Sequence, residues 1–333
     1  MRALLTLIVI ATLGWSGYWF VGQQGLQQAF GQWFEARRAE GWMAETSELS
    51  VQGFPNRFDT SFSNLALADP DTGLAWEAPF FQILTLSYRP NHVIAVWPDD
   101  QLIATPQDKF RVQSTDMRAS LVLAPSTALA PERATLTSEF LRVAPQTRPD
   151  DTTALTALTL AAERNGEATY RLGLAAEGLS PSTPWRARLD PKNTLPSQLA
   201  GVRADLTVSF DKPWDRSAIE DARPQPTYIK LDLADATWGQ LQLQAAGEVS
   251  VDANGQPSGE ITIKARNWRD ILDLAVASGA LSESMLKALE SGLSMMAQMA
   301  GNPQTLDIPL SLRNGRVMLG PVPLGPAPLL RLR

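Results

Sequence analysis

The first 21 residues constrain this chain more than any other segment. Ala3 to Val21 form an uncharged apolar run behind Arg2. About 20 helical residues cover the hydrocarbon core of a bilayer, so this run is long enough to cross a membrane. Because the next positive residues, Arg37 and Arg38, come much later, we expect the N-terminus to stay in the cytoplasm and the rest of the chain to cross.

A cleaved signal peptide is the alternative interpretation of the same segment. Leu4 to Leu13 would form its apolar region, and Gly14-Trp15-Ser16 supplies the small residues that a signal peptidase requires. Against cleavage, Tyr18 to Val21 extend the apolar run to spanning length with aromatic residues typical of a membrane interface. The sequence therefore favours an uncleaved anchor, and both interpretations place the bulk of the chain outside the cytoplasm. A lipoprotein is excluded, because the chain has no cysteine to acylate.

An amphipathic helix is expected directly after the anchor, over residues 22–41. Apolar residues recur at helical spacing from Leu26 to Phe34, while glutamines fill the other positions, and Gly41 is a plausible end. Interfacial helices usually carry more Lys and Arg on their polar face. We therefore expect this helix to dock on a sheet of the same protein.

The composition excludes several classes of function. A net charge of −6 argues against a nucleic-acid partner. The absence of cysteine removes thiolate chemistry, and the single histidine, His92, lies in a segment that resembles a turn. We therefore expect no metal site, no cofactor and no enzyme activity.

Most of the chain from Thr46 onward alternates apolar and polar residues with a period of two, which predicts half-buried strands. Asn165-Gly166 predicts a two-residue hairpin turn that places Arg164 opposite Glu167. Asn254-Gly255 predicts another turn, with a longer loop. The predicted connection is therefore an antiparallel meander.

The firmest turn prediction is Asn314-Gly315. A type I′ turn needs positive φ at both central residues, which Asn and Gly tolerate. The implied register sets Leu312 opposite Val317 and Leu310 opposite Leu319, so the apolar residues share one face.

The predicted fold is mainly β with few helices (α+β). It has an N-terminal membrane helix, then an extended, curved antiparallel β-sheet in two halves, with a C-terminal helix pair packed on the sheet. The expected boundaries are an anchor at 1–21, the amphipathic helix at 22–41, a first β-rich half at 42–180, a proline-rich linker at 181–199, and a second half at 200–333 with helices near 267–278 and 282–300.

The second of these C-terminal helices is unusual, because Ser291 to Gly301 carry no charge and are rich in methionine. Methionine adapts to irregular apolar surfaces, so this segment is either core or the lid of an apolar groove. The sequence favours core. The candidate ligand-binding residues of a groove or lid are Leu293, Met295, Met296 and Met299.

Short motifs in the first half resemble those of a Gram-negative envelope family catalogued as domain of unknown function twenty-one twenty-five. They are Gly53-Phe54-Pro55-Asn56-Arg57-Phe58-Asp59, Trp76-Glu77-Ala78-Pro79, Tyr88-Arg89-Pro90-Asn91-His92 and Arg118-Ala119-Ser120. The resemblance covers essentially the whole chain but implies no chemistry. It singles out residues of unknown role: Gly53, Pro55, Arg57, Trp76, Pro79, Arg89 and Pro90.

More distantly, Leu310 to Gly325 is similar to the ends of AsmA-like envelope proteins. That resemblance implies an inner-membrane anchor, a periplasmic body with a long curved sheet, and a role in lipid transport or outer-membrane assembly.

The sequence thus leaves three hypotheses. The favoured one is a binding or assembly module in envelope biogenesis, held in the bilayer by its N-terminal helix and partnered by lipid or an envelope protein. The second is a carboxylate-dependent periplasmic hydrolase acting on a glycan through Asp69, Asp71 and Glu77, although Asp69 to Gly73 also resembles an exposed turn. The third is a purely structural scaffold. The oligomeric state stays open.

Overall fold

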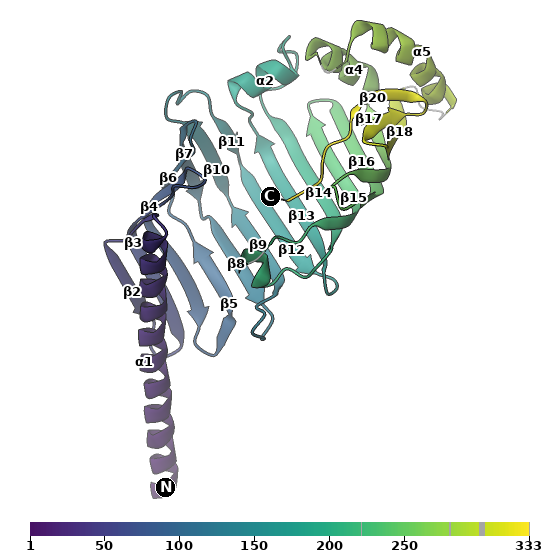
Figure 1. Ribbon diagram of the computed structural model, residues 1–333. Helices are drawn as coiled ribbons and strands as arrows, with labels where there is room; N and C mark the ends of the chain where they lie inside the picture. The colour runs from purple at the N-terminus through teal and green to yellow at the C-terminus, as the bar shows by residue number, and fades with distance from the viewer. Residues whose placement is uncertain (221, 280, 300–303, 333) are drawn as a thin grey trace. The chain divides into compact units, whose positions relative to one another are not determined.

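The structure is a computed structural model that describes residues 1–220, 222–279, 281–299 and 304–332 (Figure 1). The chain divides into two compact units. Unit 1 comprises Met1–Leu123 and Leu136–Asp150, and unit 2 comprises Ala124–Thr135 and Asp151–Arg333.

Unit 1 begins with a continuous helix, α1 (Arg2–Ala39), which includes both the expected anchor and the expected amphipathic segment. Among the described helices, α1 is the one long and apolar enough to cross a membrane. The side chains up to Trp15 are exposed, whereas Trp19 and Phe34 are buried. The first part of α1 therefore stands free, and the remainder packs on the unit.

The rest of unit 1 is an antiparallel sheet. Its strands are β1 (Met43–Glu45), β2 (Glu48–Gln52), β3 (Arg57–Asp69), β4 (Leu74–Leu86), β5 (Arg89–Val96), β6 (Asp100–Ala104), β7 (Lys109–Thr115), β8 (Arg118–Leu123) and β10 (Phe140–Pro145). Strands β1 and β2 pair along β3, which pairs with β4. Strand β4 pairs in turn with both β5 and β6. Strand β5 then pairs with β8, and β6 pairs with β7.

Helix α1 supplies the core of unit 1 together with β1 to β3. Phe34 is buried with Ala44, Phe62 and Leu65, while Trp19 is buried with Val51 and Phe58. Since the sheet faces alternate along each strand, the residues Phe58 and Phe62 point toward the same helix. The expectation that this helix docks on its own sheet agrees with these contacts.

Unit 2 is also an antiparallel sheet. It contains β11 (Thr153–Leu155), β12 (Ala157–Arg164), β13 (Thr169–Leu179), β14 (Leu199–Phe210), β15 (Pro226–Trp238), β16 (Leu241–Val251), β17 (Pro257–Arg266), β18 (Thr305–Arg313), β19 (Arg316–Leu319), β20 (Val322–Pro326) and the first part of β9 (Pro131–Ser138). Each strand from β12 to β20 pairs antiparallel with the next one. The predicted meander is confirmed, and so is the predicted fold class.

The helices of unit 2 lie in the connections between strands. They are α2 (Thr183–Leu189), α3 (Ser217–Glu220), α4 (Trp268–Ala277) and α5 (Glu283–Met299). Helices α4 and α5 pack on β17 and β18 through a buried cluster of Ala265, Trp268, Leu293, Ala297 and Leu306. This pair lies close to the residue ranges expected for it.

The turn at Asn314-Gly315 is confirmed. Both residues have positive φ, 51° and 69°. Leu312 pairs with Val317 and Leu310 with Leu319, in the register that the apolar pattern predicts.

The two-residue turn predicted at Asn165-Gly166 is wrong. Arg164 pairs with Tyr170, and the Asn165 N–H donates to the Thr169 carbonyl, so residues 165–168 form the loop. The observed register sets Leu160 opposite Leu174 and Ala162 opposite Leu172. The predicted register would set those residues opposite Arg171 and Thr169. Apolar pairing across the sheet therefore decides the register against the turn dipeptide.

The division into units also differs from the predicted linker at 181–199. That segment contains α2, and the strands on either side of it, β13 and β14, pair directly. Its prolines end one strand and begin a helix at Thr183-Pro184, which proline tolerates in the first turn. Proline-rich composition marks a connection here within one sheet.

Candidate functional site

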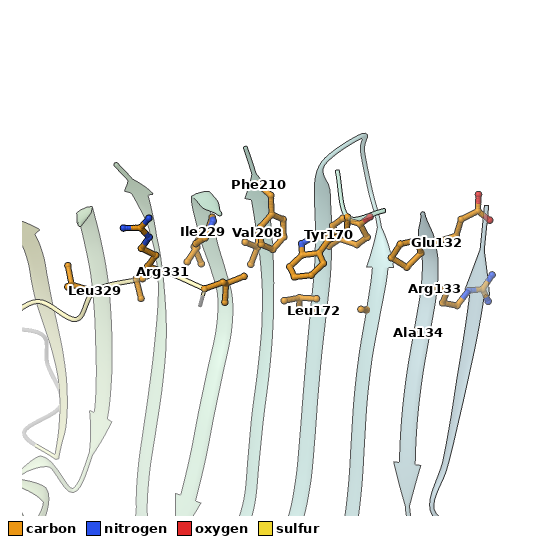
Figure 2. Close-up of a pocket in the computed structure, with 16 residues that line it drawn as sticks. Glu132, Arg133, Ala134, Tyr170, Leu172, Val208, Phe210, Ile229, Leu329 and Arg331 are labelled. Carbon is orange, nitrogen blue, oxygen red and sulfur yellow. The ribbon is translucent and has the colours of Figure 1, made fainter. Parts of the chain in front are cut away.

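An apolar pocket lies on one face of the unit 2 sheet. Its volume is about 680 Å³, within the range of about 300–1,000 Å³ typical of small-molecule sites. The lining comes from β9, β12 to β15, the connection after β14 and the C-terminal tail (Figure 2). The lining residues are Pro131, Glu132, Arg133, Ala134, Ala162, Tyr170, Leu172, Val208, Phe210, Trp214, Pro226, Ile229 and Leu329 to Leu332.

The register of the paired strands determines which side chains form the floor of this pocket. Tyr170 on β13 pairs with Val208 on β14, which pairs with Ile229 on β15. Paired residues in neighbouring strands point to the same face, so these side chains form a row across the sheet. Leu172 and Phe210 lie two residues along their strands, and they extend the same face (Figure 2).

Aromatic rings form one wall. The ring of Phe210 lies edge-on to Tyr170, with centroids 6.2 Å apart, and edge-on to Trp214, with centroids 5.6 Å apart. Such edge-to-face pairs stabilise a fixed arrangement beyond the apolar area that they bury. The wall is therefore preformed.

The C-terminal tail, residues 327–332, covers part of the pocket. Backbone N–H groups of Ala327 and Leu330 donate to the carbonyls of Gly315 and Gly255, both at 2.8 Å. Further on, the Gln225 side chain exchanges two hydrogen bonds of 3.0 Å with the backbone of Leu332. The tail is thus held at successive turns along one end of the sheet.

The Tyr170 hydroxyl is the polar group buried in this wall. Tyr170 is 5% exposed, and its oxygen has no hydrogen-bond partner of ordinary geometry among the described residues. Burial raises the pKa of this hydroxyl, and the charge of Arg164 and the nearby backbone N–H of Trp214 offset part of that rise. A buried hydroxyl without a partner is costly. The oxygen is sealed from solvent, so a ligand would have to displace the surrounding groups to accept its hydrogen bond.

Charged residues lie at the rim of the pocket. Glu132 forms an ion pair of 3.1 Å with Arg164, which joins β9 to β12. Arg133 and Arg331 lie at opposite ends of the lining in Figure 2. The pocket therefore combines an apolar interior with guanidinium groups at its edges.

A smaller apolar pocket of about 350 Å³ lies in unit 1, between α1 and β3 and β4. Its lining includes Phe30, Phe62 and Trp76. The indole N–H of Trp76 donates to the buried side-chain oxygen of Gln101 at 2.7 Å. Trp76 therefore has a structural role in joining β4 to β6.

The methionine-rich helix divides between buried and exposed positions. Leu293 is buried in the α4–α5 cluster, whereas Met295 is 65% exposed. The side chains of Met296 and Met299 lie outside the described residues. The lid hypothesis for these residues stays a prediction.

The motif residues gather mainly at one end of the unit 1 sheet. Gly53 and Pro55 form the turn that leads to Arg57 in β3, and Arg89 and Pro90 begin β5 after the adjacent turn. Gly53 has φ of 105°, and a Cβ there would lie 2.8 Å from the Cβ of Arg57, so glycine is required. Trp76 and Pro79 lie within β4.

The acidic residues of the hydrolase hypothesis do not converge. The carboxylate of Asp69 accepts hydrogen bonds from the Thr72 hydroxyl, which lowers its pKa most, and from the Asp71 N–H, which lowers it further. Glu77 pairs with Ala66, three residues from Asp69, so the two side chains point to opposite faces. Asp69 therefore stabilises its own turn.

His92 lies in strand β5, not in the predicted turn. Its Nε2 lies 2.9 Å from the Ser120 hydroxyl on β8. The turn is shorter than predicted, because β4 continues to Leu86 and β5 already begins at Arg89.

Sequence reasoning missed Tyr170, Phe210, Trp214 and the tail. The alternation of Tyr170 with Leu172 and of Val208 with Phe210 was visible as a strand pattern. No local signal indicates that residues 329–332 return to the face where these side chains lie.

One of three comparisons with known proteins gives a match. The family model described as "Uncharacterized protein conserved in bacteria (DUF2125)" matches residues 19–328. No curated protein and no solved structure matches the chain. The match confirms the first family resemblance seen in the motifs and leaves the AsmA-like one untested.

Proposed function

Because this chain belongs to the DUF2125 family, whose description names no activity, we propose its function from geometry: a membrane-anchored protein that binds one hydrocarbon chain of an acidic lipid. The apolar pocket of unit 2 is the binding site in this proposal. The role is binding and not catalysis.

The pocket itself is the observation that carries this proposal. The pocket has a volume of about 680 Å³, with an apolar floor and a preformed aromatic wall. These features suit a flexible hydrocarbon chain, since burial of apolar surface needs no directional partner. The Tyr170 ring contributes to this wall, and a ligand that displaced the groups around its buried hydroxyl would gain a hydrogen bond.

The rim supports an acidic head group. Guanidinium groups bind carboxylates and phosphates through paired hydrogen bonds, and Arg133 and Arg331 both line the pocket. A head group held at either end would leave its acyl chain on the apolar floor.

The test is binding of a fluorescent fatty acid to the purified full-length protein. Ala162→Trp places an indole in the pocket, so we expect it to weaken binding about tenfold or more. Ala161→Trp is the matched control, because Ala161 is exposed on the other face of β12 and its affinity should change less than about twofold.

Equal affinities of the two variants would reject the pocket as the binding site. Absence of binding by the wild-type protein would reject the lipid proposal altogether and favour an assembly scaffold.

We also propose that α1 is an uncleaved single-pass anchor in the inner membrane and that the bulk of the chain lies in the periplasm. Arg2 before the apolar run supports this orientation. A reporter enzyme that is active only outside the cytoplasm, fused after Gly41, should be active. Activity of a cytoplasm-only reporter at the same position would reject the orientation.

A further inference from the structure

The apolar run of α1 is longer than the part of α1 that stands free of unit 1. Side chains from Met1 to Trp15 are exposed, but Trp19 is 4% exposed and packs on Phe58 of β3. Arg2 to Gly14, the part of α1 before its first hydrogen bond to the sheet, covers about 20 Å of helix, whereas the hydrocarbon core of a bilayer is about 30 Å thick. Any tilt of the helix increases the deficit.

Hydrogen bonds hold one end of the unit 1 sheet against α1, beside residues Trp15 to Trp19. The Trp15 indole donates to the Pro55 carbonyl at 2.9 Å, in the turn between β2 and β3. The Tyr18 hydroxyl donates to the carbonyl of Ser87 at 2.6 Å, in the turn between β4 and β5. A spanning α1 therefore brings both turns, residues 53–56 and 87–88, to the membrane with it.

The side chains at these turns suit a membrane interface. Phe54 is 52% exposed and stacks on Phe20 of α1, with ring centroids 5.9 Å apart. Tyr88 is 58% exposed in the neighbouring turn. Aromatic residues concentrate where the acyl region meets the head groups.

Side chains of α1 also donate hydrogen bonds to backbone carbonyls in and beside the turns, as a low-polarity environment requires. Unsatisfied carbonyls are costly at membrane depth, and irregular backbone is tolerated there where protein groups satisfy it. Trp15 and Tyr18 supply such donors to Pro55 and Ser87, and the Trp19 indole donates to the Arg57 carbonyl at 2.8 Å.

Charged residues begin directly behind the turns. Arg57 pairs across the sheet with Leu86, and Leu86 pairs with Arg89, so both arginines lie in one row. Lipid phosphates are the groups that guanidiniums at this level would meet.

We propose that the β2–β3 and β4–β5 turns enter the lipid leaflet on the side of unit 1, with Phe54 and Tyr88 at the acyl boundary and Arg57 and Arg89 among the phosphates. This inference rests on the proposed anchoring by α1. It makes the membrane contact of this protein a combined surface of one helix and two turns, which fixes the orientation of unit 1 on the bilayer.

The experiment uses single-cysteine variants of the full-length protein, since the chain has no cysteine of its own. Phe54→Cys, Asn56→Cys and Tyr88→Cys are labelled with an environment-sensitive fluorophore and reconstituted in vesicles of phosphatidylethanolamine and phosphatidylglycerol. Spin-labelled lipids then quench each label according to its depth. Asn56→Cys repeats the measurement in the first turn with Phe54 intact.

Ile8→Cys and Asp71→Cys are the controls. Ile8 lies in the free part of α1 and should be quenched by deep spin labels. Asp71 lies at the other end of β3, about 40 Å from the proposed contact, and should not be quenched. We expect labels at 54, 56 and 88 to be quenched by spin labels near the head groups.

Two results would overturn the inference, and they are distinguishable. In the first, the label at position 8 is quenched, but the labels at 54, 56 and 88 are no more quenched than the label at 71. This result would reject the turn contact but keep the anchor. Absence of quenching at Ile8 would reject the anchor and the inference with it.

Discussion

The indole nitrogen of Trp15 lies 2.9 Å from the carbonyl oxygen of Pro55, 40 residues further along the chain. Four residues on, the Trp19 indole donates to the Arg57 carbonyl. The helix that is long enough to cross a membrane is thus hydrogen-bonded to the sheet while still within its apolar run. Helix α1 is part of the architecture of unit 1 and not a flexible tether.

Trp19→Ala should therefore destabilise unit 1. Trp19 is buried between α1 and the sheet, stacked on Phe58 with ring centroids 5.8 Å apart. Loss of a buried aromatic side chain costs about 3–5 kcal/mol. Thermal unfolding of the full-length protein in detergent measures the effect.

Val21→Ala is the control for that substitution. Val21 lies on α1 two residues from Trp19 but is largely exposed, so its replacement should change stability by less than about 0.5 kcal/mol. Equal melting temperatures for the two variants would contradict the role of Trp19.

The outcome at the turns shows which parts of the fold sequence can predict. Asn314-Gly315 joins strands whose apolar residues agree with the two-residue turn, so the local and cross-strand signals give the same register. At Asn165-Gly166 the two signals conflict, and apolar pairing decides the register. Where local and long-range preferences agree, sequence predicts the structure; where they conflict, buried area across the sheet decides.

The pocket was beyond such prediction for a different reason. Alternation shows that Tyr170 and Leu172 share a face, but not which face the tail covers. The tail is positioned by Gln225, more than 100 residues away, through hydrogen bonds between a side chain and backbone. The alternation of apolar and polar residues in the sequence does not indicate such a contact.

The contrast between the two Asn-Gly turns can be tested directly. Replacing Asn314-Gly315 with Val-Val forces β-branched residues to positive φ at both positions, at a cost of about 1–2 kcal/mol each. The same replacement at Asn165-Gly166 meets no positive φ and should cost much less. Melting temperatures of the two variants should differ clearly, and equal losses would show that the first turn is misassigned.

The methionine-rich helix yields a second matched pair. Leu293→Ala should cost about 2–5 kcal/mol, because Leu293 is buried against Trp268 and Leu306. Met295→Ala removes an exposed side chain and should cost less than about 0.5 kcal/mol. Chemical denaturation measures both. A small effect of Leu293→Ala would instead support the view that this helix opens as a lid.

The last prediction concerns Tyr170 and pH. Tyr170→Phe removes a buried hydroxyl that has no hydrogen-bond partner of ordinary geometry in the described chain. Such a group costs about 1–3 kcal/mol when it is left unsatisfied. The variant should therefore be at least as stable as the wild-type protein without ligand at neutral pH. Its affinity for a fatty acid should fall if the hydroxyl donates to the ligand.

The sign of the pH dependence follows from burial, which raises the pKa of Tyr170 in the folded state above its unfolded value of about 10. Below that unfolded value the contribution to stability is constant. Above it the unfolded chain releases the proton first, so the unfolding free energy falls as pH rises toward the folded pKa. Wild-type protein should thus lose stability relative to Tyr170→Phe above about pH 10, as measured by denaturant unfolding across that range.

Tyr228, whose pKa is raised chiefly by its hydrogen bond with Glu248, is present in both proteins, so its effect cancels in the difference. Parallel stability profiles of the two proteins would contradict the burial of an ionisable hydroxyl at this site.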